Sequence, residues 1–168
     1  MDRLFLQFSI DKLRQSVDRI EQCVARLSED QVWWRADDSN NSIGNLLLHL
    51  SGNVRQWIIS SIGGAPNIRQ RDAEFAARGG DSPAQLVAKL KQTVEEATAV
   101  LDGVSAARLE ERVKIQDYEM SVLEAIYHVV EHFTLHTGQI MFVTKLVTKQ
   151  DLGFYKHLNQ PSHNQATP

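Results

Sequence analysis

The sequence contains one cysteine among 168 residues, no cluster of lysines and arginines, and no long uninterrupted run of apolar residues. The single cysteine, Cys23, cannot form an internal disulfide, and this usage is typical of a reducing cytoplasm. Without a basic face, a nucleic-acid or anionic-membrane partner is not expected. No apolar stretch reaches the roughly 20 residues that a transmembrane helix needs, so we expect a cytoplasmic protein without membrane spans.

Signals of export, of internal repeats and of phosphate binding are also absent. The start, MDRLFLQFSIDKLRQ, is interrupted by charges at Asp2, Arg3 and Asp11, so we do not expect a signal peptide. We find no internal repeat and no glycine-rich phosphate loop. The composition is ordinary, with 42% hydrophobic residues, 23% charged residues and a formal net charge of −3. The length suits one domain with a buried core.

Four amphipathic segments dominate the hydrophobic pattern. In each of them apolar residues recur at steps of three and four, the spacing of helices that pack along one face. The segments cover residues 13–27, 42–62, 83–101 and 121–147. Two starts carry capping-box spacing, Ser82 with Gln85 and Ser121 with Glu124. The sequence therefore predicts an all-α protein built as a four-helix bundle.

The connections are predicted to carry shorter elements. Residues 27–41 have box spacing from Ser28 to Gln31, which favours a short helical turn. Residues 63–83 are bracketed by glycine pairs and are too long for a tight turn, so we expect a short extra helix and a lid there. Residues 102–120 alternate like an extended segment. The predicted domain organisation is a bundle over 1–150 and a poorly structured tail over 151–168.

Three histidines stand four residues apart in HVVEHFTLHTGQI, at His128, His132 and His136. On a helical wheel, His136 lies closest to the apolar core direction, His132 lies near its edge and His128 points outward. His128 and His136 are separated by about 12 Å along the axis, too far to share one ion easily. A single metal ion would therefore take the inner pair and a further ligand from another helix.

His49 is the candidate for that further ligand. It shares a helical stripe with residues that are polar but uncharged, namely Ser42, Asn45, Asn53, Gln56 and Ser60. Such a stripe on an otherwise apolar helix suits the lining of a wet interior cleft. The alternative is that residues 128–136 form a solvated helix face and that His49 is a hydrogen-bonded core residue. The matching phases of the histidines favour the metal site.

These motifs resemble the DinB/YfiT-like family of four-helix bundles. The H-x-x-x-H-x-G-Q-I sequence at 132–140 resembles the family's fourth helix, and SIGNLLLHLSGNVRQWI at 42–58 resembles its second. RDAEF at 71–75 and the Trp-Trp pair resemble one branch. The resemblance implies an up-down-down-up bundle with one divalent metal on His49, His132 and His136. The family includes transferases of the small thiols bacillithiol and mycothiol, and members without a known activity.

The chemistry expected of this site is that of an open metal centre. Three imidazoles leave coordination positions free, as catalytic sites require. Zinc or nickel is the preferred ion, with iron and manganese as alternatives. We expect a small-molecule substrate, a homodimer, and either a transferase that joins a low-molecular-weight thiol to an electrophile or a hydrolase. The alternative is a non-catalytic metal-containing bundle, a dimeric stress-response or binding module.

The polar residues of the second connection are the candidates for further roles at the site. Asp72 and Glu74 could act as a base or accept a hydrogen bond from a ligand histidine, and Arg71 is grouped with them as catalytic. Arg69 could bind a carboxylate-bearing thiol cofactor. In the fourth helix, Gln139 could line the cofactor cleft, and Gly138 is expected to permit close approach of a neighbouring helix.

Overall fold

Four long helices form the body of the protein in a computed structural model that describes residues 2–159. They are α1 (Asp2–Val24), α3 (Ile43–Val54), α5 (Pro83–Asp102) and α7 (Val122–Thr148). Shorter elements connect them: α2 (Glu29–Trp33), the π-helical η1 (Arg55–Ile62), α4 (Arg71–Ala76), α6 (Ala106–Glu110), β1 (Arg112–Ile115) and β2 (Tyr118–Ser121). The prediction of an all-α bundle with a short helix in its second connection is confirmed.

The helices begin where side chains can satisfy their first backbone N–H groups. The predicted boxes at the starts of α2, α5 and α7 are all present. A further box was not predicted: Ser42 accepts from the Asn45 backbone, and Asn45 Oδ1 accepts from the Ser42 backbone. Ser42 therefore starts α3 rather than lining its polar stripe.

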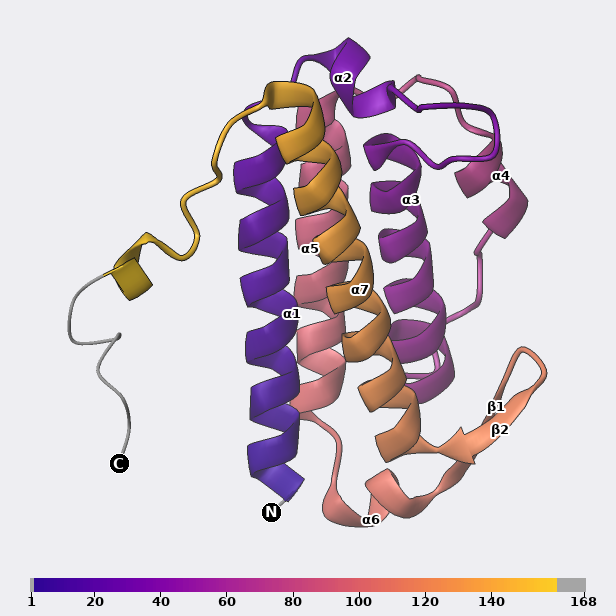
Figure 1. The fold of residues 1–168 in the computed structure, drawn as a ribbon. Coiled ribbons are helices and arrows are strands. Elements are labelled where there is room, and N and C mark those ends of the chain that lie inside the picture. Colours follow the sequence, from indigo (N-terminus) through magenta and orange to yellow (C-terminus); the bar gives the residue numbers. More distant parts are fainter. Residues whose placement is uncertain (1, 160–168) are drawn as a thin grey trace.

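Figure 1 shows the up-down-down-up order of the four helices. α1 and α7 run in one direction, and α3 and α5 run in the other. α1 packs against α5 and α7, while α3 packs against the other sides of the same two helices. The core between them is mostly aliphatic, with Leu13, Leu50, Leu90 and the aromatic Phe133 almost completely buried. This arrangement places α3 and α7 side by side and antiparallel.

The extended segment predicted at 102–120 forms a two-stranded antiparallel hairpin. β1 pairs with β2 from Arg112 opposite Ser121 to Ile115 opposite Tyr118. Ile115 is buried, so the hairpin is anchored at the end of the bundle from which α7 starts.

The predicted tail, 151–168, lies partly outside the described residues. In the described part, Leu152 is buried and Arg26 donates hydrogen bonds to the carbonyls of Asp151 and Leu152. A short 3-10 helix, η2 (Lys156–Asn159), follows. Within residues 2–159, no helix combines the length and the apolar character needed to cross a bilayer.

Two glycines of the bundle have opposite surroundings. A Cβ on Gly44, in the first turn of α3, would lie 2.7 Å from the indole ring of Trp33, so Trp33 packs directly on the backbone there. A Cβ on Gly138 would meet no heavy atom within 4 Å. The expectation that Gly138 permits close helix approach is therefore wrong, because its side of α7 faces open space.

We expect Gly44→Ala to lower the free energy of unfolding by about 1–3 kcal/mol, because the rigid indole must move and its hydrogen bond to the Asp81 carbonyl is disturbed. Gly138→Ala is the matched control and should raise that free energy by about 0.5–1 kcal/mol, the usual gain of alanine over glycine in a helix. Urea denaturation followed by circular dichroism measures both. Equal effects of the two substitutions would contradict this role of Trp33.

Candidate metal centre

Two neighbouring helices bring three imidazoles together. His132 and His136 lie one turn apart on α7, and His49 contacts His132 from α3. The Nε2 of His132 is 3.1 Å from the Nε2 of His49 and 3.1 Å from the Nε2 of His136. Two nitrogens bound to one zinc ion, each at about 2.0–2.1 Å, lie roughly 3–3.4 Å apart. The three histidines form a group that could hold a metal ion.

Hydrogen bonds on the far side of two rings determine which nitrogens are free. His49 Nδ1 is 3.2 Å from Oε2 of Glu74, and His136 Nδ1 is 2.7 Å from Oε1 of Gln139. A carboxylate and an amide oxygen only accept, so these two contacts are hydrogen bonds in the tautomers that carry the proton on Nδ1. In that tautomer of His49, Arg69 Nη2, 3.1 Å from the same nitrogen, donates to Oε2 of Glu74 instead. Both Nε2 atoms then present lone pairs. Carboxylate and amide acceptors behind ligand histidines are the arrangement found at metal sites.

The third ring shows why a cation fits this cluster. His132 Nε2 can carry one proton at most, so it cannot donate to both neighbouring Nε2 atoms. Its Nδ1 is buried without a hydrogen-bond partner among the described residues. Without a cation, at least one of the two Nε2–Nε2 contacts at 3.1 Å has no proton to make it a hydrogen bond. A divalent ion would accept all three lone pairs, so the residues fit a metal.

Glu74 is held beside His49 by a buried ion pair. Arg69 donates from Nε to Oε1 and from Nη2 to Oε2 of Glu74, both at 2.8 Å. The Arg69 and Glu74 side chains are only 4% and 10% exposed. Arg69 also donates to Oε1 of Gln56, and its Nη2 lies 3.1 Å from His49 Nδ1. The guanidinium thus interacts with the protein itself, which does not support the expectation that Arg69 binds a cofactor carboxylate.

The position of Glu74 depends on two residues of α3. A Cβ on Gly52 would lie 1.9 Å from Oε1 of Glu74, so only glycine lets the carboxylate approach α3 this closely. Asn45 Nδ2 donates to the carbonyl oxygens of Glu74 and Ala77 and so attaches α4 to the start of α3. The sequence placed Asn45 on the polar stripe, but nothing local indicated either contact.

The other candidates from the second connection lie further out. Arg71 is exposed, and its guanidinium lies 4.9 Å from the centre of the Phe75 ring. Phe75 in turn contacts His49, with ring centres 4.8 Å apart. Asp72 is exposed and forms no ion pair with any residue between 2 and 159. Of the acidic and basic residues within α4, only Glu74 contacts a histidine.

His128 lies outside the three-histidine group but does not point freely into solvent. It is half-buried between Trp57 and His132, with ring centres 4.4 Å and 5.8 Å away. The prediction that it points outward is therefore wrong. Trp57 belongs to η1, which continues α3 without a break. Its contact with α7 joins two helices, so a helical wheel of α7 alone could not predict it.

Burial and mutual repulsion disfavour the protonated forms of His132 and His136. Burial, and then the neighbouring His136, His49 and His128, lower the pKa of His132 to about 3. Burial also lowers the pKa of His136, although its hydrogen bond to Gln139 opposes this. For Glu74, burial raises the pKa, but hydrogen bonds from Arg69 and His49 outweigh it, and the pKa lies below its ordinary value. Neutral His132 and His136 imidazoles and an ionised Glu74 are the forms that bind and support a metal.

This predicts acid sensitivity of the metal-free protein. The unfolded chain protonates His132 near pH 6.5, whereas the folded chain does so only near pH 3. Between these values the unfolded state binds the extra proton, so acidification favours unfolding. We expect the free energy of unfolding to fall as the pH drops from 6.5, with His132 contributing at most about 1.4 kcal/mol per unit.

Urea denaturation in the presence of a chelator, repeated across this pH range, measures the effect. His132→Gln should reduce the slope of stability against pH. His157→Gln, at an exposed histidine remote in sequence from the cluster, is the control and should leave the slope unchanged. An unchanged slope in His132→Gln would show that its proton is not excluded from the folded state.

Two solved structures share this architecture. The conserved protein of locus from Enterococcus faecalis superposes with a TM-score of 0.70 and 14% sequence identity, covering 86% of this chain and 97% of its own. A DinB-like protein (YjoA) from Bacillus subtilis gives a TM-score of 0.66 and 14% identity, covering 88% of this chain and 96% of its own. At such identities the likeness shows the fold alone, which is DinB-like as the sequence motifs indicated.

Comparison of the sequence with known proteins identifies a family. No curated protein matches the chain. The profile of the family described as protein of unknown function (DUF1572) matches residues 1–162, which include all four long helices and the three clustered histidines. The chain therefore belongs to the DUF1572 family, with a DinB-like fold.

Proposed function

We propose that the protein binds one divalent metal ion through the Nε2 atoms of His49, His132 and His136. The observation that carries this proposal is the convergence of three imidazole nitrogens, with acceptors behind two of the rings. Imidazole ligands suit several ions, and we favour zinc or nickel over iron and manganese. His128 is not among the ligands, because its ring stacks on His132 beside Trp57.

We further propose that the centre is catalytic. Bound to three imidazoles, such an ion keeps open positions and lowers the pKa of a bound water or thiol. Glu74 would hold the His49 Nδ1 proton and fix the orientation of that ring, and Gln139 would do the same for His136. Phe75 covers one side of His49 and limits access of water.

The reaction class we favour is transfer of a low-molecular-weight thiol to an electrophile, with hydrolysis as the second candidate. Exposed Arg71 beside Phe75 is the cation best placed to bind a carboxylate of a small substrate approaching His49. We assign carboxylate binding to Arg71 rather than to Arg69, because Arg69 forms an ion pair with Glu74. We propose no role for Asp72 in proton transfer, since it contacts none of the three histidines.

A homodimer and a cytoplasmic location remain predictions. The feature that supports self-association is a row of exposed apolar side chains on α7, which share one face of the helix at 100° per residue. They are Tyr127, Leu135, Phe142 and Leu146. The single cysteine supports a reducing compartment.

We expect the protein to bind one equivalent of zinc or nickel and to lose it when a ligand histidine is replaced. His49→Ala, His132→Ala and His136→Ala should each abolish stoichiometric binding, because two imidazoles hold an ion much more weakly than three. His128→Ala is the matched control on the same helix and should retain the metal. Elemental analysis after dialysis, with circular dichroism to verify folding, measures this.

The opposite pattern would mean that the wrong histidines have been identified. Loss of metal from His128→Ala together with retention in His136→Ala would shift the site toward Trp57. Equal metal content in all four folded variants would exclude this cluster as the binding site.

We expect the metal-loaded protein to accelerate the reaction of a small thiol with a chlorodinitrobenzene electrophile, or the hydrolysis of a nitrophenyl ester. The His132→Ala variant should be inactive. The wild-type protein should lose its activity when a chelator removes the metal and regain it when the metal is added back. Absorbance at the product wavelength measures the rate. Stoichiometric metal without turnover across a panel of thiols and esters would favour the non-catalytic binding module instead.

A further inference from the structure

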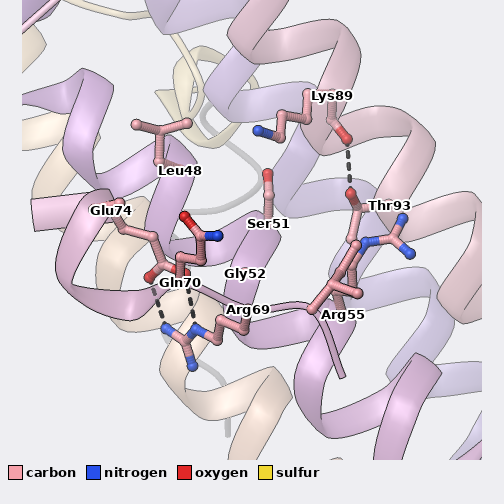
Figure 2. A pocket seen from close by; sticks show the side chains of 11 residues that line it. Leu48, Ser51, Gly52, Arg55, Arg69, Gln70, Glu74, Lys89 and Thr93 are labelled. Atoms are coloured by element: carbon pink, nitrogen blue, oxygen red, sulfur yellow. Dashed lines mark hydrogen bonds and ion pairs between the residues drawn. The ribbon is translucent and has the colours of Figure 1, made fainter. Parts of the chain in front are cut away.

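A cavity lies between α3, α4 and α5, and none of the three clustered histidines lines it (Figure 2). Its volume is about 330 Å³, the lower end of the range for small-ligand sites. The residues that define it come from four parts of the chain: Leu48 and Ser51 from α3, Ile68 and Gln70 from the segment before α4, Ala73 from α4 and Lys89 from α5.

The Arg69–Glu74 ion pair separates this cavity from the metal centre. Both residues line the cavity, and Figure 2 shows their two parallel hydrogen bonds at its edge. On its other side Glu74 contacts His49. Because both charges are satisfied by each other, the pair contributes a polar but electrically neutral wall to the cavity.

The charge that remains at the cavity is positive. Arg55 is paired with Glu96 at 2.5 Å, so it is neutralised at the rim. Lys89 forms neither an ion pair nor a side-chain hydrogen bond within residues 2–159, and its ammonium reaches from α5 across the opening toward Ser51 (Figure 2). The amide of Gln70 also has no hydrogen-bond partner in this part of the chain. Both groups can therefore donate to a bound anion.

The rest of the lining is apolar and partly uncovered. Leu48, Ile68 and Ala73 contribute hydrocarbon surface to the cavity. Ile68 is 69% exposed, so part of this apolar surface is in contact with solvent. An exposed isoleucine and an unpaired lysine that line one cavity are the combination that a ligand with an apolar body and one negative charge would cover.

We propose that this cavity binds a small carboxylic acid with an aliphatic or aromatic body, independently of the metal. The carboxylate accepts hydrogen bonds from the Lys89 ammonium and the Gln70 amide, and the apolar body covers Leu48 and Ile68. The site shares the Arg69–Glu74 wall with the histidine cluster but uses none of its ligand nitrogens.

The test is a titration of the full-length, zinc-loaded protein with hexanoate, followed by isotope-edited NMR. Shifts should concentrate in α3, α4, α5 and the connection around Gln70. Lys89→Gln should weaken hexanoate binding about tenfold or more, as expected for loss of a charge-assisted hydrogen bond. Neutral hexanamide should bind the wild-type protein with a similar deficit.

Two matched variants distinguish binding in this cavity from binding at the metal or at surface lysines in general. Lys91→Gln removes a lysine of the same helix that is paired with Glu21 outside the cavity, and it should leave hexanoate binding unchanged. His132→Ala, which removes a metal ligand, should also leave it unchanged. Loss of hexanoate binding in His132→Ala would show that the acid binds the metal instead. Equal binding to wild-type protein and Lys89→Gln, or equal binding of hexanamide, would likewise overturn the proposal.

Discussion

The carboxylate of Glu74 lies in a region that is almost closed to water. It is stable there because it forms an ion pair with Arg69, whose side chain is only 4% exposed. Either charge alone would lose its hydration without compensation, so neither is stable there without the other. Gln56 and His49 supply further contacts for the pair. This interaction therefore fixes the path of the second connection and attaches α4 to the side of α3.

The two sites depend on the same ion pair. Toward α7, Glu74 accepts from His49 Nδ1, which leaves Nε2 free to face His132. Toward α5, the pair closes one wall of the cavity between α3, α4 and α5. Removing one of its charges would leave the other buried and unpaired, a costly state that relaxes by moving the connection. The histidine geometry and the cavity shape would then change together.

The bundle topology supplies the remaining geometry. His49 and His132 are 83 residues apart, yet their Nε2 atoms lie within 3.1 Å because α3 and α7 run antiparallel in contact. Both helices are long and closely packed, so each ring is held by a rigid backbone. By contrast, α4 has only six residues and depends on Asn45 and Arg69 for its position. The three histidines thus belong to the rigid part of the site.

The sequence by itself determined what is local. Helix periodicity, capping boxes and the phase of His132 and His136 follow from 3.6 residues per turn, so they were predictable. Tertiary packing alone decided which of two nearby arginines, Arg69 or Arg71, pairs with Glu74. It also placed His128 against Trp57 and made Gly52 necessary, because these contacts join elements whose relative docking depends on side chains distant in the chain.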